Sequence, residues 1–486
     1  MSLPFLANAS DIVVWAAGTR EAQALLPELI RRLVLATVQP SPSFVEMRAN
    51  EGVALPGWDG RVECVAGNTF VPSGASGWEM GVQKDAGKKV RGDYGKRTKL
   101  PAPLDPATST FVFVTPRRWA GRDAWLKEAR KASPWKDLRV LDVDDLAAWL
   151  VTAPGVHLWF SALIGKPAIE AQSLESWWMS WQPLTVPPMG ARLLLSGRTA
   201  QAHALKEELS APPHLITVRA ETSEEALSFI AASLSSESEE VLRTRTVLVH
   251  TAAAWAYLAA HHEPLVLIPK GIRESELWGP AIRNGHTVIL PVGTEERMSI
   301  AVDVPRIAAH DAREALEAEG VTSPEATYAA GTLRRSLAAY RRIFASGDAP
   351  LPGWATPEHC EMLGTLALLG SWRDDRERDK EAVERLVQRP YVDVRSILLR
   401  FTASGDPPFR LTGEVWRVSE KEDAWRVTAS VVSKERVRLF LDLTTEVLSD
   451  TPTPPDDEPL RHLIGSNQPT YTHSVLRQVV DDGCVS

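Results

Sequence analysis

The chain has 486 residues, of which 44% are hydrophobic and 24% charged, with a formal net charge of −8 at pH 7. The length predicts two to four domains, and the acidic balance excludes a protein that binds nucleic acid over its whole surface. No apolar run approaches the about 18 residues of a membrane helix, and no basic segment precedes an apolar one at the N-terminus, so we expect neither a membrane span nor a secretory signal. The three cysteines are far apart, which favours a reducing, cytoplasmic location over a disulfide framework.

Residues 1–165 are predicted to form one mixed α/β domain. Apolar residues at helical spacing predict a helix over 19–38. Alternation of apolar runs with Gly, Pro and Ser turns predicts the elements that follow. These are strands at 61–66 and 77–83, a basic helix at 86–98, a strand at 110–116, a helix at 122–132, a strand at 138–144 and a helix at 145–154.

A strongly basic segment lies inside this acidic protein. Residues 84–99 hold seven basic side chains against two acidic ones, a local net charge of +5. Such a run is either a solvated helix face or a surface that meets an anionic partner.

A Trp- and Pro-rich stretch at 174–190 separates this domain from a second α/β domain, predicted at 190–305. We expect Trp177, Trp178 and Trp181 of this stretch to pack in the interface between the two domains. Apolar runs that alternate with helical segments predict a doubly wound, Rossmann-like parallel sheet covered on both faces. The expected strands are 192–197, 214–220, 245–251, 264–270 and 286–292.

The second domain lacks the residues of a phosphate-binding loop. A P-loop needs G-x-x-x-x-G-K-[ST] between its first strand and a helix, so that backbone N–H groups and the lysine surround the phosphates. The expected first strand leads instead into a segment with one glycine, Gly197, and no Gly-Lys pair. We therefore expect no nucleotide hydrolysis; Gly197, Arg198 and Thr199 form either a plain turn or a small anion site at a helix N-terminus.

The rest of the chain is predicted to be mostly helical. We expect a helical domain at 306–400, a small winged-helix-like module at 401–450, and a tail at 451–486. Four arginines of the helical domain lie on what is expected to be either a solvated helix face or a partner-facing one. They are Arg334, Arg335, Arg341 and Arg342.

Two acidic residues of the first domain are spaced as on a metal-binding hairpin. Asp59 lies directly before the predicted strand at 61–66, and Glu79 lies twenty residues later on the next strand. Two carboxylates so placed can hold one or two Mg²⁺ ions, which polarise a phosphate and lower the pKa of an attacking water. The alternative is that Asp59 is a turn residue and Glu79 an ordinary polar residue.

A nuclease of this kind also uses a lysine to orient the water or stabilise the charge at phosphorus. The usual place, two residues after the second carboxylate, is Gly81 here. Lys84 on the same strand, or Lys88 or Lys89 on the following helix, can supply the charge, since a long lysine side chain can reach back into the same space.

Five segments carry a resemblance to a known family: PGWDG, VPSGASGWEMG, the K-x-x-x-DY-x-KR helix that begins at Lys89, FVFVTPRRW and LRVLDVDDLAAWL. Through them, residues 45–150 resemble the Mrr/restriction-endonuclease-like branch of the PD-(D/E)XK superfamily. In large bacterial proteins such a domain resembles the nuclease part of anti-phage defence systems, fused to a STAND- or AAA-like NTPase module. The second domain is similar to such a module in layout only.

The resemblance implies an α/β/α nuclease domain that cuts DNA with Mg²⁺ or Mn²⁺. By matching positions, Asp59 and Glu79 would be metal ligands and Lys89 the migrated lysine, with Lys84 and Lys88 as rivals. Contacts to backbone phosphates would come from Tyr94, Lys96, Arg97, Arg117 and Arg118. The rival hypothesis is a non-catalytic sensor or scaffold that only binds DNA or a defence-system partner, and either protein could form a homo-oligomer.

Overall fold

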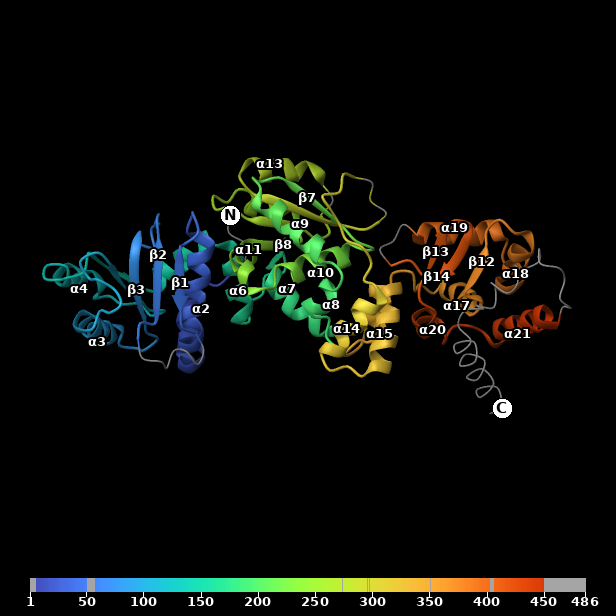
Figure 1. Cartoon of the computed structure of the whole chain (residues 1–486), viewed down its shortest axis with the longest axis horizontal. Helices are drawn as coiled ribbons and strands as arrows, with labels where there is room; N and C mark the ends of the chain where they lie inside the picture. Colours follow the sequence, from blue (N-terminus) through green and yellow to red (C-terminus); the bar gives the residue numbers. More distant parts are fainter. Residues whose placement is uncertain are drawn as a thin grey trace. The chain divides into compact units, whose positions relative to one another are not determined.

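The structure is a computed structural model that describes residues 6–49, 57–272, 274–294, 296, 298–349, 351–402 and 406–449 (Figure 1). The predicted tail at 451–486 lies outside the described residues. The fold is mixed α/β with parallel-rich sheets and a helical C-terminal region, which confirms the predicted fold class. No helix in the described part of the chain is long and apolar enough to cross a membrane. The chain divides into two compact units, residues 1–181, 203–217 and 230–290, and residues 182–202, 218–229 and 291–486.

The N-terminal sheet has five strands in sequence order. The first three run antiparallel to their neighbours, and the last three are parallel. The strands are β1 (Phe44–Met47), β2 (Gly60–Cys64), β3 (Gly74–Met80), β4 (Thr110–Val114) and β5 (Asp137–Leu141). The sequence predicted the last four within a few residues and missed β1, which is short and pairs only with β2.

Helices cover both faces of this sheet, because alternate residues of the central strand β4 point to opposite sides. Val112 and Val114 pack into a core with one set of helices, and Phe111 and Phe113 pack into a core with the other set. Figure 1 shows α3 on one side of the sheet and α2 on the other. The first set is α1 (Ala9–Ala17), α2 (Thr19–Thr37), α5 (Val143–Thr152) and α6 (Pro154–Leu163), and the second is α3 (Ala86–Lys99) and α4 (Arg122–Ala129).

The second sheet has six strands in the order β11-β7-β10-β9-β8-β6. Strand β6 (Ala171–Ser173) is an antiparallel edge, while the pairs β8–β9, β9–β10 and β7–β11 are parallel. The remaining strands are β7 (Leu215–Arg219), β8 (Thr246–Val249), β9 (Val266–Pro269), β10 (Thr287–Val292) and β11 (Val302–Asp303).

The predicted first strand of this sheet, 192–197, is wrong. Residues Ala191–Leu195 form helix α8. The run Ala-Arg-Leu-Leu-Leu contains only strong helix formers and no β-branched residue, whereas β7 to β10 are rich in Val, Ile and Thr. The other helices around the sheet are α9 (Thr199–Ser210), α10 (Ser223–Ser233), α11 (Glu240–Arg245), α12 (Ala252–Ala259) and α13 (Trp278–Arg283).

The three tryptophans expected at an interface lie on helix α7 (Leu174–Trp181) and are buried. This helix contacts β6 and β8 of the second sheet as well as α6, which itself contacts both strands. Trp177 and Trp181 stack with ring centroids 5.4 Å apart. The aromatic cluster therefore joins two parts of the first unit.

The C-terminal region contains a small antiparallel sheet in the order β12-β14-β13. Strand β12 (Ser371–Arg373) lies in the stretch 306–400 that the sequence predicted as helical, so this region is not helical throughout. Its elements α17 (Cys360–Leu369), β12, α18 (Glu377–Val387), α19 (Tyr391–Thr402), β13 (Phe409–Thr412) and β14 (Val415–Val418) follow the order of a winged helix. The other helices are α14 (Ala309–Ala318), α15 (Ser323–Arg335), α16 (Leu337–Ile343), α20 (Lys421–Thr428) and α21 (Lys434–Ser449).

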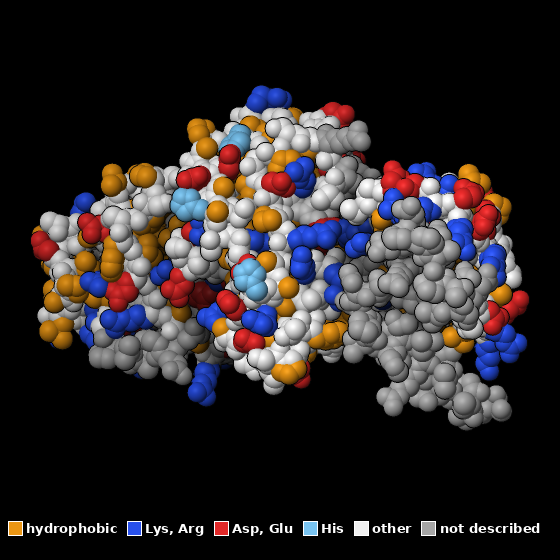
Figure 2. Space-filling model, turned by 45° about the vertical axis from the view of Figure 1, so that its right-hand side comes forward, with side chains coloured by type: hydrophobic (Ala, Val, Ile, Leu, Met, Phe, Trp, Pro, Cys, Tyr) orange, Lys and Arg blue, Asp and Glu red, His pale blue; other side chains and the backbone are white. Residues whose placement is uncertain are grey.

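The arginine-rich segment of α15 and α16 is mostly not a solvated face. Arg335 pairs with Glu420, and Arg342 pairs with Asp423 at 2.6 Å. Arg334 is exposed. On the face that Figure 2 shows, basic and acidic side chains are mixed, in keeping with the modest net charge.

Candidate functional site

The structure brings Asp59 and Glu79 together at the end of the β2–β3 hairpin. Gly60 pairs with Trp78, so the next position in the same antiparallel register places Asp59 opposite Glu79. Residues opposite each other in such a pair share one face, with Cβ atoms about 4.5–5.5 Å apart. The backbone N–H of Met80 donates a hydrogen bond to Asp59 Oδ2 at 2.8 Å, which fixes that carboxylate against the neighbouring strand.

The two carboxylates are held in a desolvated place. Glu79 is 2% exposed. Burial, together with the nearby charge of Asp59, raises the pKa of Glu79 to about 8, although Arg97 opposes the shift. Burial also raises the pKa of Asp59, against the hydrogen bond from Met80 and the charge of Lys89. Like charges kept close at a cost in stability are typical of functional sites.

Helix α3 faces this carboxylate pair with three side chains at helical spacing. Lys89, Asp93 and Arg97 follow each other at i, i+4 and i+8, which puts them on one side of the helix. Lys89 Nζ donates to Asp93 Oδ1 at 3.0 Å. The helix begins at Ala86, after Asp85 accepts a hydrogen bond from the backbone N–H of Lys88.

The side chain of Lys89 packs over Gly81, in the space that a side chain at position 81 would fill. A Cβ atom at Gly81 would lie 2.8 Å from Lys89 Cγ and 2.8 Å from Gln83 Oε1, closer than real Cβ atoms come, and 3.2 Å from Phe113 Cζ, which is tighter than most real contacts. A side chain at position 81 would therefore force Lys89 or its neighbours to shift. Lys84 and Lys88 are exposed, and neither lines the cavity around the carboxylates, so Lys89 is the best placed of the three predicted lysines.

Substitution of Gly81 tests this packing. We expect Gly81→Ala to displace Lys89 and to lower the free energy of unfolding by about 1–3 kcal/mol, as overpacking does in a filled interior. Urea denaturation measures the loss. Gly92→Ala on the solvent side of α3 is the control, because a Cβ there meets nothing within 4 Å; equal stability of the two variants would contradict the account.

Arg97 is turned into the site and not toward solvent. Its guanidinium donates to the carboxylate of Glu79 and to the backbone carbonyl of Gly57, and it lies 4.9 Å from the centre of the Trp58 ring. The predicted role as a surface phosphate contact does not describe this position. In the structure Arg97 is the internal counter-ion of Glu79.

A cavity of about 300 Å³ joins these groups. Its charged lining consists of Asp59, Glu79, Asp93, Lys89, Lys96 and Arg97. Within the described ranges, no group of three or more His, Cys, Asp or Glu residues is placed to hold a metal ion. Mg²⁺ typically binds through one or two carboxylates and keeps several waters, so the oxygen donors of Asp59 and Glu79 fit that ion, provided that Arg97 gives up its hold on Glu79.

The other predicted nucleic-acid contacts are mostly engaged within the domain. Tyr94 packs edge-on against Phe111 and Trp125. Arg117 donates to three backbone carbonyls, those of Val82, Ala16 and Val13 at 2.9, 2.6 and 3.4 Å.

Two of the five predicted contacts remain at the surface. Arg118 forms an exposed ion pair with Asp144 at 2.7 Å. Lys96 is exposed and lines the cavity, so it is the predicted contact best placed to meet a phosphate there.

The predicted anion site of the second domain is filled by the protein itself. The Arg198 side chain is 1% exposed and binds Glu225 and the carbonyl of Pro305. Strand β7 leads to α10 through residues 220–223, a turn that contains neither glycine nor lysine. The plain-turn interpretation therefore fits better than a phosphate site.

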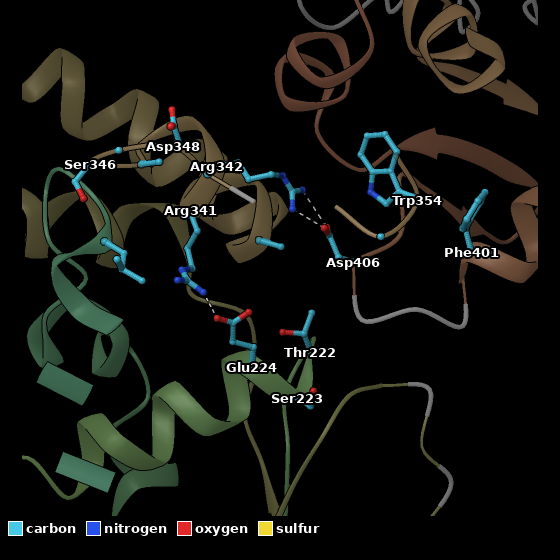
Figure 3. Close-up of a pocket in the computed structure, with 16 residues that line it drawn as sticks. Thr222, Ser223, Glu224, Arg341, Arg342, Ser346, Asp348, Trp354, Phe401 and Asp406 are labelled. Atoms are coloured by element: carbon cyan, nitrogen blue, oxygen red, sulfur yellow. Dashed lines mark hydrogen bonds and ion pairs between the residues drawn. The ribbon is translucent and has the colours of Figure 1, made fainter. Parts of the chain in front are cut away.

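A second cavity, of about 720 Å³, lies in the other unit and was not among the predicted sites (Figure 3). Trp354 and Phe401 supply aromatic surface, and Arg341 and Arg342 supply charge. Both arginines are bound to acidic residues, Arg341 to Glu224 and Arg342 to Asp406, as the dashed lines of Figure 3 show. The paired Arg341-Arg342 run was its only sequence signal.

The raised pKa of Glu79 predicts a pH-dependent stability in the absence of metal. The folded value is about 8 and the ordinary value 4.5, so between these pH values the folded state binds the proton more tightly. The free energy of unfolding should therefore fall as pH rises from about 5 to 8. Thermal denaturation in EDTA across this range measures the slope; Glu79→Gln should flatten it, and an unchanged slope in that variant would exclude Glu79 as the titrating group.

No protein-family model matches the chain, and no curated protein matches it. The candidate site is therefore defined by its own geometry. The half-buried carboxylate of Asp59 lies opposite the buried carboxylate of Glu79 on a hairpin, the side chain of Lys89 packs over Gly81, and Arg97 binds Glu79.

Proposed function

We propose that the N-terminal domain is a metal-dependent endonuclease that hydrolyses phosphodiester bonds of DNA. The observation that carries this proposal is the placement of Asp59 and Glu79 opposite each other on β2 and β3, with Lys89 reaching over Gly81 into the same cavity. The α/β/α layers and the strand order agree with the restriction-endonuclease-like fold that the sequence resembles.

In the proposed reaction, Asp59 and Glu79 would hold Mg²⁺ or Mn²⁺. When bound, the ion supplies Lewis-acid polarisation of the phosphate and an acidified water. Lys89 presents its ammonium group to the charge that develops on the phosphate oxygens, and Lys96 at the rim attracts the DNA backbone. Overall a water oxygen bonds to phosphorus, the bond between phosphorus and the leaving oxygen breaks, and the protons of the water pass to that oxygen and to solvent.

The biological role that we propose rests on the resemblance of the sequence to defence-system nucleases. We propose a cytoplasmic effector of a bacterial anti-phage defence system, in which the second α/β domain acts as a sensor or oligomerisation part that does not hydrolyse nucleotides. The filled Arg198 position and the glycine-free turn after β7 support the absence of hydrolysis. Release of phosphate from ATP by the full chain would contradict this part of the proposal.

One observation favours a second candidate, a nucleic-acid-binding sensor or scaffold without catalysis. Arg97 forms an ion pair with Glu79. The protein itself therefore supplies the positive charge that a metal ion would otherwise bring to this carboxylate. In that case the cavity and Lys96 would bind DNA and nothing would be cut.

Cleavage separates the two candidates. The full chain is incubated with plasmid DNA, and separately with a single-stranded RNA, in Mg²⁺, Mn²⁺ or EDTA. The proposal expects metal-dependent nicking of DNA that Asp59→Ala and Glu79→Ala lose. Retarded migration of DNA without any metal-dependent product would favour the scaffold.

A further inference from the structure

We infer that Arg97 is an internal substitute for the metal cation, which holds Glu79 until a metal enters and then presents its guanidinium to the DNA phosphate. This inference rests on the proposed metal site. It assigns to Arg97 two alternative partners, Glu79 in the free protein and a phosphate oxygen in the complex.

The first step of the argument is that Arg97 and a metal compete for the same carboxylate. Glu79 is almost fully buried, and the Arg97 Nε–H binds its Oε1. A metal ligand must turn a carboxylate oxygen toward the ion, and two cations in contact with one buried carboxylate repel each other. The ion pair between Arg97 and Glu79 therefore weakens metal binding.

The second step is that the cavity offers the Arg97 side chain a position away from Glu79. Its guanidinium lines the cavity together with Lys89 and Lys96, and it stacks on Trp58. The stacking and the hydrogen bond to the Gly57 carbonyl do not involve Glu79, so both can keep the side chain at the cavity when the carboxylate is released. Arginine suits a phosphate because its planar fork can donate two parallel hydrogen bonds.

The third step is that such an exchange couples metal to substrate. A phosphate that binds Arg97 draws it from Glu79 and frees the carboxylate for the ion, and an ion on Glu79 frees Arg97 for the phosphate. By linkage each ligand then raises the affinity for the other by the same factor. The site would hold metal poorly until DNA is present.

The test measures Mn²⁺ binding to the full chain without DNA, by electron paramagnetic resonance of the free ion at pH 8. We expect Arg97→Gln to bind Mn²⁺ about tenfold more tightly than the unaltered protein. Arg97→Lys should lie between them, because lysine keeps the charge but lacks the planar fork whose separate nitrogens bind Glu79 and the Gly57 carbonyl. Equal or weaker binding by folded Arg97→Gln would overturn the inference. If that variant melts early, Arg97→Lys carries the same comparison.

A second measurement separates this inference from the proposed function. Binding of a short DNA duplex is measured with and without Ca²⁺, an ion expected to occupy the site without supporting cleavage. The unaltered protein should gain DNA affinity with Ca²⁺, and Arg97→Gln should lose most of this gain; an equal gain in both would overturn the exchange. If Mn²⁺ binding rises in Arg97→Gln and is abolished by a further Glu79→Gln, but no protein cuts DNA, the proposed function fails and the inference stands.

Discussion

Asp59→Ala and Glu79→Ala should each lower the rate of DNA cleavage by at least about a hundredfold. Each substitution removes one of the two carboxylates that the β2–β3 pairing brings opposite each other. These are the proposed ligands of an ion that would supply much of the electrostatic stabilisation of the transition state. Single-turnover nicking of supercoiled plasmid, with protein in excess, measures the chemical step without product release.

The control for this experiment lies on the same hairpin. Glu63 is an exposed carboxylate of β2, and Glu63→Ala removes the same charge without touching the cavity, so its rate should stay within about twofold. DNA binding by the two site variants should persist or rise, since each loses a negative charge near the phosphates. Equal rates for Asp59→Ala, Glu79→Ala and Glu63→Ala would place the chemistry elsewhere.

Lys89→Met should lower cleavage by about 10²–10³-fold while leaving the fold intact. Methionine keeps the aliphatic stem that packs over Gly81 and removes only the ammonium group, which is the part proposed to stabilise charge on the phosphate. The expected loss appears in kcat, because an interaction made in the transition state is lost.

Lys84→Met and Lys88→Met are matched controls, since each removes the same charge from an exposed side chain next to the site. Both should weaken DNA binding slightly and make it less sensitive to salt, with little change in the cleavage rate at saturation. A rate loss in Lys84→Met or Lys88→Met that matches that of Lys89→Met would show that the total charge matters and not the position of Lys89.

Much of the fold could be predicted because the strands carry their own signal. Continuous Val-, Ile- and Thr-rich runs located β4 and β7 to β10. The leucine run within 192–197 led to a wrong strand prediction, because a short apolar run by itself does not distinguish a strand from a buried helix segment. Its lack of β-branched residues is the feature that favours the helix. Strands β6 and β12 have three residues each and are too short to produce a period. Strand β1 has four residues, but Glu46 interrupts its apolar run and it is only partly buried.

The candidate site was predictable in position but not in orientation. The spacing of Asp59 and Glu79 specified a hairpin pair, and the structure places the two opposite each other. Sequence gives the charge of Arg97 and Arg117 but not the direction of their side chains. Both turn inward, where Arg97 binds the buried carboxylate of Glu79 and Arg117 binds three backbone carbonyls.

The central claim is that DNA cleavage by this chain depends on a metal held at Asp59 and Glu79. The most direct measurement follows the conversion of supercoiled plasmid to nicked and linear DNA by the purified full chain. The reaction is run in Mg²⁺, in Mn²⁺, in EDTA, and in EDTA followed by an excess of Mn²⁺. Glu79→Gln, purified in the same way, is measured under the same conditions. We expect nicked and linear DNA only where the ion is available and only from the unaltered protein. Product in EDTA, equal product from Glu79→Gln, or no product with either ion would contradict the account.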